Sequence, residues 1–321
     1  MTESLTEAPG GGRTFLDFPF APDPNAIHGG FAVLGVPFGM PYSAEAAPND
    51  QSRAPDALRR VSGSEDIRYT REHYDFDLDG YLLDGRDIAV VDCGNVTAVT
   101  NDPAEHYRRA ERAARGIYAA GATLIGIGGD HGITIPLLRA LEELGREVTL
   151  VHVDAHLDWR DEINGEPNGY SSPIRRASEM DWIGSIVQVG MRAIGSARMK
   201  EVEAARAYGA EIVTAYELHD KGIAHVLERV PDGGPYYLTI DADGVDPALM
   251  PGVIAPAPGG LDWFQLHELV HGLVRKGPVL GMDLVEIAPS CDVRDLTLLT
   301  AERLICNFIG ASIRAGHSAR S

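Results

Sequence analysis

The chain has 321 residues, of which 44% are hydrophobic and 23% are charged, a composition typical of a globular protein with a substantial core. Its 28 Lys and Arg stand against 47 Asp and Glu, and the formal charge of −19 disfavours nucleic acid and anionic membrane surfaces and favours small cationic ligands. Three cysteines without CxxC spacing exclude a disulfide framework and a thiolate zinc site, and they predict free thiols in a reducing cytoplasm.

Residues 1–30 are predicted to form a flexible N-terminal arm, because the opening segment MTESLTEAPGGGRTF has neither a secretory signal pattern nor a strand pattern. No window approaches the ~20 apolar residues of a membrane span. From residue 31 to residue 321, short β-rich apolar runs alternate with longer segments of helical period, which predicts one α/β domain around a mostly parallel sheet. The predicted strands are 31–36, 88–92, 122–127, 148–154, 186–190, 237–241 and 279–284.

Two helices are marked by the residues at their ends. After the second strand, Asp102 can cap a helix, Glu105 can complete a capping box, and Gly121 ends the segment. A later helix begins at Asp262, with Gln265 three residues further on. The buried faces are predicted to be Tyr107, Ala110, Ala114, Ile117 and Tyr118 in the first helix, and Leu266, Leu269, Val270, Leu273 and Val274 in the second.

Acidic and imidazole side chains recur directly after three of these strands. The sequence reads GGDHG at 128–132, DAHLD at 154–158 and DADGVDP at 241–247. The carboxyl ends of parallel strands share one edge of a sheet, so these side chains can converge. If the segments stay extended, alternate residues of DAHLD and of Asp241-x-Asp243 project to one side.

Six candidate metal ligands result. They are His131, Asp154, His156, Asp158, Asp241 and Asp243. Four carboxylates and two imidazoles suit hard or borderline ions such as Mn²⁺, and two divalent cations ~3.5–4 Å apart would balance the charge and activate water near neutral pH. Each cluster alone also fits a turn, a helix cap or a core histidine. Three clusters at three strand ends favour a binuclear metal site.

Four motifs resemble, in order and spacing, the signatures of the ureohydrolase (arginase and agmatinase) family. They are GGDHGIT at 128–134, VDAHLDW at 153–159, DADGVDP at 241–247 and GMDLVEIAP at 281–289. The resemblance runs from about Phe31 to the C-terminus. It implies a three-layer α/β/α fold, the six ligands above around two manganese ions (nickel in some members), and a guanidinium held by Glu286. A planar guanidinium suits a carboxylate through paired, charge-assisted hydrogen bonds.

The resemblance also implies the activity of this catalytic domain. An agmatinase-like member hydrolyses a guanidino compound to urea and an amine, and works as a cytoplasmic homo-oligomer, a trimer or a hexamer. Asp158 would orient the attacking water and Glu286 the cation. Free guanidine, a guanidino acid or a biguanide stay open as alternative substrates.

Two stretches depart from the family pattern. Where members that act on agmatine and related amines carry His-Gly-x-Pro-Phe-Arg, this chain has YSSPIR, so Tyr170 replaces the histidine implicated in proton transfer. Tyr170 and Ser171 are therefore expected to border the substrate. Where Gly-Thr-Gly-Thr-Pro-Glu is usual, the chain has GVIAPA. A wall of Val253, Ile254 and Ala257 in place of polar and acidic groups predicts a poor agmatinase that prefers a smaller or differently ended guanidino compound.

Other motifs keep alternatives open. His267 and His271 fit the HExxH signature of zinc proteases, although they lie on an amphipathic helix. A non-catalytic partner subunit is a second alternative, which the complete ligand set disfavours. His152 is expected to be a hydrogen-bonded core residue and Trp159 to serve in packing. The glycine run before His131 lacks the last glycine of a dinucleotide-binding loop.

Overall fold

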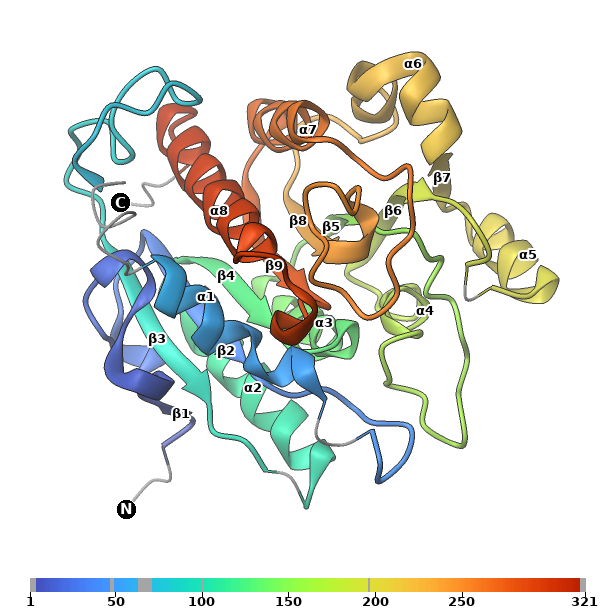
Figure 1. The fold of residues 1–321 in the computed structure, drawn as a ribbon, viewed down its shortest axis with the longest axis horizontal. Coiled ribbons are helices and arrows are strands. Elements are labelled where there is room, and N and C mark those ends of the chain that lie inside the picture. Colours follow the sequence, from blue (N-terminus) through green and yellow to red (C-terminus); the bar gives the residue numbers. More distant parts are fainter. Residues whose placement is uncertain (1–3, 47–48, 63–70, 100, 196, 318–321) are drawn as a thin grey trace.

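The computed structural model describes residues 4–46, 49–62, 71–99, 101–195 and 197–317, which form a nine-stranded sheet with helices on both faces (Figure 1). The strands are β1 (Thr6–Glu7), β2 (Phe31–Val36), β3 (Val90–Val96), β4 (Thr123–Gly128), β5 (Val148–Val153), β6 (Ile183–Met191), β7 (Glu211–Thr214), β8 (Tyr236–Asp241) and β9 (Val279–Val285). The helices are α1 (Ala54–Ser62), α2 (Pro103–Ala119), α3 (Thr134–Arg139), α4 (Pro173–Ala177), α5 (Met199–Tyr208), α6 (Ala215–Leu227), α7 (Trp263–Lys276) and α8 (Leu296–Arg314).

The strand order in the sheet is β1-β3-β2-β4-β9-β8-β5-β6-β7. Every neighbouring pair is parallel except β1 with β3. All seven predicted strands are present, although β3 begins and ends later than predicted and β6 is longer. The edge strands β1 and β7 were not predicted, because two and four residues are too short for a periodic signal.

Successive residues of the strands enter two separate apolar cores. In β2, Phe31 and Val33 pack on the face covered by α1, α6, α7 and α8, whereas Ala32 and Leu34 pack on the face covered by α2, α3, α4 and α5 (Figure 1). Burial of both faces requires apolar residues at every position, which explains the continuous apolar runs in the sequence. The predicted three-layer α/β/α architecture is confirmed.

Both predicted helix starts are present, with one difference. The side chain of Asp102 caps α2 by accepting a hydrogen bond from the Glu105 N–H at 2.9 Å. The Glu105 carboxylate does not return to the cap, because it pairs with Arg108 and Arg109 instead. In α7 the capping box closes as predicted, between Asp262 and the third residue of the helix. The predicted inward faces of both helices are buried.

The sequence analysis expected no segment apolar enough to span a membrane, and helix α8 is an exception to that expectation. Among the described residues, one helix is long and apolar enough to cross a membrane. This is α8, which has 19 residues and a mean hydropathy of 1.3 over its most apolar window. However, 83% of that window is buried inside the fold, against α1 and α7. Its apolar surface therefore belongs to the protein core.

The N-terminal segment packs on the sheet rather than forming a flexible arm. The short strand β1 pairs with β3, and the side chains of Phe15 and Phe18 are buried. The backbone N–H of Phe15 donates a hydrogen bond to the Asp92 carboxylate at 2.7 Å. Burial of these aromatic rings offsets the entropy lost on ordering the segment. The division of the chain at residue 30 stays a prediction.

Candidate metal centre and substrate pocket

Six side chains converge at the carboxyl ends of three strands near the middle of the sheet, and we call them the Asp/His cluster. They are His131, Asp154, His156, Asp158, Asp241 and Asp243. They follow β4, β5 and β8, with β9 lying between β4 and β8. The carboxyl ends of these parallel strands meet at one edge, so the sequence prediction of convergence is confirmed.

One half of the cluster surrounds His131. Its Nδ1 lies 3.2 Å from Oδ2 of Asp154 and 3.1 Å from Oδ2 of Asp158. The same nitrogen lies 3.1 Å from Oδ2 of Asp241. The Nε2 atom lies 3.0 Å from the hydroxyl of Thr239, which leaves Nδ1 to face the carboxylates. A histidine held in this way through its second nitrogen is typical of a metal ligand.

The other half of the cluster surrounds His156. Its Nδ1 lies 3.4 Å from Oδ1 of Asp154 and 3.2 Å from Oδ2 of Asp243. Asp154 thus presents Oδ2 to His131 and Oδ1 to His156. The cluster has two adjoining parts with Asp154 between them, which is the arrangement that two neighbouring cations require.

The charge of the cluster fits bound cations. Its four carboxylates are buried, and burial raises the pKa of Asp241 well above its ordinary value, with further repulsion from Asp243. The pKa of His156 is raised to about 12 by its hydrogen bonds to Asp154 and Asp243. The described residues that line the adjoining cavity include no Lys or Arg. Four carboxylates against two imidazoles leave an excess of buried negative charge, which is costly and which divalent cations would neutralise.

The backbone that positions these ligands differs from the extended conformation predicted. The DAHLD segment bends after Asp154, and Asp158 adopts a left-handed backbone with φ of 51°. Asp241 caps a 3-10 helix, η8 (Ala242–Gly244), by accepting the Asp243 N–H at 2.8 Å. Convergence therefore results from turns rather than from alternation along a strand. A left-handed conformation in a residue other than glycine is uncommon and is often found at functional sites.

Residues beside the cluster behave as the sequence predicted. His152 is fully buried, with Nε2 2.8 Å from Asp154 Oδ2 and Nδ1 3.1 Å from the Gln188 amide. It also lies close enough to His131, Asp154 and Asp158 to belong to a possible metal-binding group. Trp159 packs in the apolar core against Tyr208 and does not line the cavity.

Glu286 lies beside the cluster, directly after β9. Its Oε1 accepts the backbone N–H of His131 at 2.8 Å, and its Oε2 accepts the side-chain amide of Gln51 at 2.8 Å. Burial raises the pKa of Glu286 to about 8, and the charge of Asp130 adds to the increase. A buried carboxylate that has no Lys or Arg beside it among the described cavity residues suits a cationic ligand.

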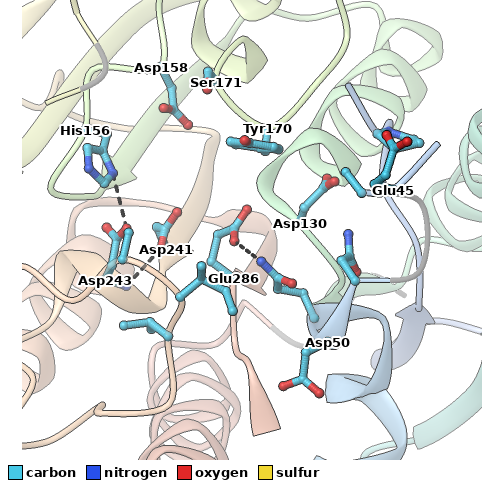
Figure 2. Close-up of a pocket in the computed structure, with 17 residues that line it drawn as sticks. Glu45, Asp50, Asp130, His156, Asp158, Tyr170, Ser171, Asp241, Asp243 and Glu286 are labelled. Carbon is cyan, nitrogen blue, oxygen red and sulfur yellow. Dashed lines mark hydrogen bonds and ion pairs between the residues drawn. The ribbon is translucent and has the colours of Figure 1, made fainter. Parts of the chain in front are cut away.

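A cavity of about 520 Å³ opens over the cluster and Glu286 (Figure 2). Tyr170 and Ser171 lie on its wall, as predicted, and Tyr170 is 43% exposed. The Tyr170 ring packs on Tyr42 with centroids 4.6 Å apart, and the Tyr42 hydroxyl accepts the Ser171 N–H at 2.9 Å. Tyr42 therefore holds the YSS segment at the cavity.

The second altered stretch also reaches the cavity, with one correction. Val253, Ile254 and Ala255 line it. Ala257 was predicted to lie there, but it is buried elsewhere, and its carbonyl accepts hydrogen bonds from the Arg192 guanidinium. Ala257 is therefore not among the residues that line the cavity.

The HExxH motif forms no metal site. The rings of His267 and His271 stack 3.9 Å apart on α7, and their Nε2 atoms lie near the Asp77 carbonyl and the Asn307 side chain respectively. Glu268 is exposed. Over the described ranges, the possible metal-binding groups lie only in the Asp/His cluster and its neighbour His152. Within the described residues the structure therefore gives the protease interpretation no support.

Sequence reasoning missed three residues of the cavity region: Gln51, Tyr42 and Asp130. Gln51 comes from a 3-10 helix, η4 (Asp50–Arg53), that lies 235 residues before Glu286. No local pattern marks Gln51 or Tyr42 as functional. Asp130 stands in the GGDHG motif, where its acidity beside a predicted ligand was a usable signal.

Known proteins resemble this chain over most of its length. The sequence model of the arginase family matches residues 30–310. A guanidinobutyrase of Pseudomonas aeruginosa is 36% identical over 221 residues, which cover 67% of this chain and 69% of that protein. An agmatinase of Escherichia coli is 32% identical over 295 residues, or 90% of each chain. The solved structure of proclavaminate amidino hydrolase from Streptomyces clavuligerus superposes with a TM-score of 0.81 at 27% identity, covering 94% of this chain and 97% of that one. Together with the fold and the Asp/His cluster, these similarities show that the chain belongs to the arginase family.

Proposed function

We propose that this protein is an amidinohydrolase that cleaves a C–N bond of a guanidino compound, releasing urea and an amine. The observation that carries the proposal is the Asp/His cluster and Glu286 in one cavity (Figure 2). The cluster would hold two divalent cations, and Glu286 would bind the guanidinium through paired hydrogen bonds. Relatives named guanidinobutyrase and agmatinase support this substrate class.

The residues of the chain would divide the chemistry among them. Two bound cations would supply Lewis acidity that activates water near neutral pH and stabilises developing negative charge. Asp158 would orient the attacking water, and Glu286 would orient the trigonal carbon of the guanidinium towards it. Tyr170 and Ser171 would close the cavity over the substrate, with the Tyr170 hydroxyl as a hydrogen-bond donor.

The metal and the setting are further parts of the proposal. Carboxylate and imidazole ligands favour Mn²⁺, with Ni²⁺ as the second candidate. We expect a cytoplasmic homo-oligomer, a trimer or a hexamer, without nucleic-acid or membrane partners. The negative charge of the chain and its free cysteines support these expectations. Urea release from the protein loaded with either metal, measured across a panel of guanidino compounds, tests the activity and the metal together.

The panel also tests substrate choice. We expect agmatine to be a poor substrate, because Val253, Ile254 and Ala255 offer no partner to a distant ammonium group on their side of the cavity. Values of kcat/KM are to be compared for agmatine, 4-guanidinobutyrate, arginine, guanidine and a biguanide. If agmatine ranks first by tenfold or more, the altered wall is neutral and the prediction is wrong.

Gln51→Ala is expected to raise KM more than it lowers kcat. Gln51 donates to Glu286 Oε2 and thereby fixes the orientation of the carboxylate that would bind the substrate. Loss of one hydrogen bond to a charged group costs about 1–2 kcal/mol, or roughly a 5- to 30-fold rise in KM. Arg53→Ala is the matched control, because Arg53 lies in the same turn with an exposed side chain. Equal KM values for both variants would contradict a positioning role for Gln51.

A further inference from the structure

Asp130 is a second carboxylate in the cavity, outside the Asp/His cluster. It lies between β4 and the 3-10 helix η6 (His131–Ile133), and its side chain is only 1% exposed. Its Oδ1 accepts the Gly132 N–H at 2.9 Å and caps η6. No donor within the described part of the chain reaches its Oδ2, although this atom is buried. A buried carboxylate oxygen without a donor is costly, and such an oxygen suits a ligand.

The Asp130 carboxylate is enclosed on its Gly39 side and lies at the wall of the cavity. The backbone of Gly39 abuts the carboxylate so closely that a β-carbon at position 39 would lie 1.9 Å from it. The cap on η6 holds Oδ1, so that Oδ2 is the oxygen for which the described residues offer no donor. The carboxylate is among the groups that line the cavity, and Figure 2 shows it across from Glu286 beneath the Tyr170 wall.

Asp130 and Glu286 are two carboxylates at a cavity whose described lining residues include no Lys or Arg. Asp130 lies near enough for its charge to raise the pKa of Glu286. Both oxygens of Glu286 already accept hydrogen bonds from the protein, from His131 and Gln51. Two cations in the Asp/His cluster would neutralise the cluster itself and leave this pair uncompensated. Since no Lys or Arg is found among the described lining residues, the compensating charge comes from bound protons or from the ligand, and a guanidinium would supply a full positive charge.

We propose that Asp130 is a substrate-binding residue whose Oδ2 accepts an N–H of the guanidinium, so that Asp130 and Glu286 hold the substrate cation from two directions. This inference rests on the proposed function. A guanidinium has more N–H donors than one carboxylate can accept, so a second acceptor finds a donor available. A single carboxylate leaves the planar guanidinium some freedom to rotate within the plane of the cation. A second carboxylate would restrict that rotation.

Asp130→Asn separates substrate binding from capping. Asparagine caps a helix as well as aspartate does, so the hydrogen bond from Gly132 is retained. At the Oδ2 position, however, the acceptor becomes an NH₂ donor that faces the N–H groups of the guanidinium. Glu45→Gln is the matched control, because it removes the same charge from an exposed carboxylate at the same cavity.

The measurements are guanidinium affinity and metal content. Metal-loaded proteins are titrated with guanidinium chloride in a calorimeter, with potassium chloride as the ionic-strength reference, and bound metal is counted by elemental analysis. We expect Asp130→Asn to bind guanidinium at least tenfold more weakly than the unmodified protein, with the same metal content and melting temperature. Glu45→Gln is expected to change the affinity less than twofold.

Three results overturn the inference. The first is unchanged guanidinium affinity in Asp130→Asn, and the second is an equal loss in Glu45→Gln. If Asp130→Asn loses metal or fails to fold, Asp130→Ser is measured in its place, because serine keeps a capping oxygen. The third result is loss of metal from Asp130→Ser as well, which would mean that Asp130 supports the metal ligand His131 instead of binding substrate. Failure of the proposed function is distinguishable, because it is an absence of urea release by the unmodified protein.

Discussion

Asp243→Ala is expected to abolish urea release while the protein stays folded. Asp243 contributes to the part of the Asp/His cluster around His156, where its Oδ2 lies 3.2 Å from Nδ1. Without this carboxylate one cation loses a charged ligand. The loss of several kcal/mol of transition-state stabilisation corresponds to a fall of roughly a thousandfold or more in kcat.

The fold should survive this change for an electrostatic reason. Burial raises the pKa of Asp243, and repulsion from the buried Asp154 carboxylate adds to the increase, so removal of Asp243 relieves both in the metal-free protein. The unmodified protein should gain melting temperature on addition of Mn²⁺, whereas the variant should gain much less. Both effects are measured by thermal unfolding with and without metal, together with metal analysis.

Asp246→Asn is the control for Asp243→Ala within the same DADGVDP motif. Asp246 accepts the N–H groups of Ala248 and Gly259 and lies outside the Asp/His cluster. Asparagine keeps an acceptor oxygen there, so activity and metal content should be close to those of the unmodified protein. If Asp246→Asn loses metal as completely as Asp243→Ala does, the effect comes from the loop fold and not from ligation.

Glu286→Gln is expected to reduce kcat/KM severely and to leave the metals bound. Loss of a charge-assisted pair in a water-excluded cavity costs about 2–5 kcal/mol, a fall of roughly 30-fold to several thousandfold. The new amide fits locally, because its oxygen can accept from His131 N and the Gln51 amide can turn to offer its own oxygen. The expected effect therefore reflects lost charge rather than lost structure.

Kinetics and metal analysis on the same Glu286→Gln preparation decide between two roles. A substrate-binding carboxylate predicts full metal content with a large change in kcat/KM. A metal content that falls by half with unchanged substrate affinity would instead make Glu286 a ligand of the metals. Guanidinium binding to the metal-loaded variant gives a check that does not depend on turnover.

Residues whose placement follows from the sheet could be predicted from the sequence. His131, Asp154 and Asp241 stand where apolar strands end, and the topology of a parallel sheet brings such ends together. The apolar runs and the helix caps were sufficient to predict the three-layer architecture. The loops have no comparable rule. The segment 252–257 has no periodicity that would show which of its residues face the cavity. In the folded chain Ala255 lines the cavity, whereas the carbonyl of Ala257 accepts a hydrogen bond from Arg192.

The sequence prediction missed Gln51 and Asp130 for two different reasons. Gln51 reaches Glu286 across 235 residues of sequence, and a lone glutamine carries no chemical signature. Asp130 was visible as an acidic residue next to a predicted ligand. Its availability depends on the cap of η6, which takes Oδ1 and leaves Oδ2 without a donor among the described residues, and only the folded chain shows this.

The position of β9 in the sheet has a consequence for the order of folding. This strand comes last in the chain, yet it lies between β4 and β8, whose ends carry His131 and Asp241. Until residues 279–285 insert, those two strands have no common neighbour, and their contacts must close long loops at an entropic cost. The two halves of the Asp/His cluster can therefore reach their final spacing only after almost the whole chain has emerged from the ribosome. High-affinity metal uptake would then mark the end of folding rather than guide its beginning.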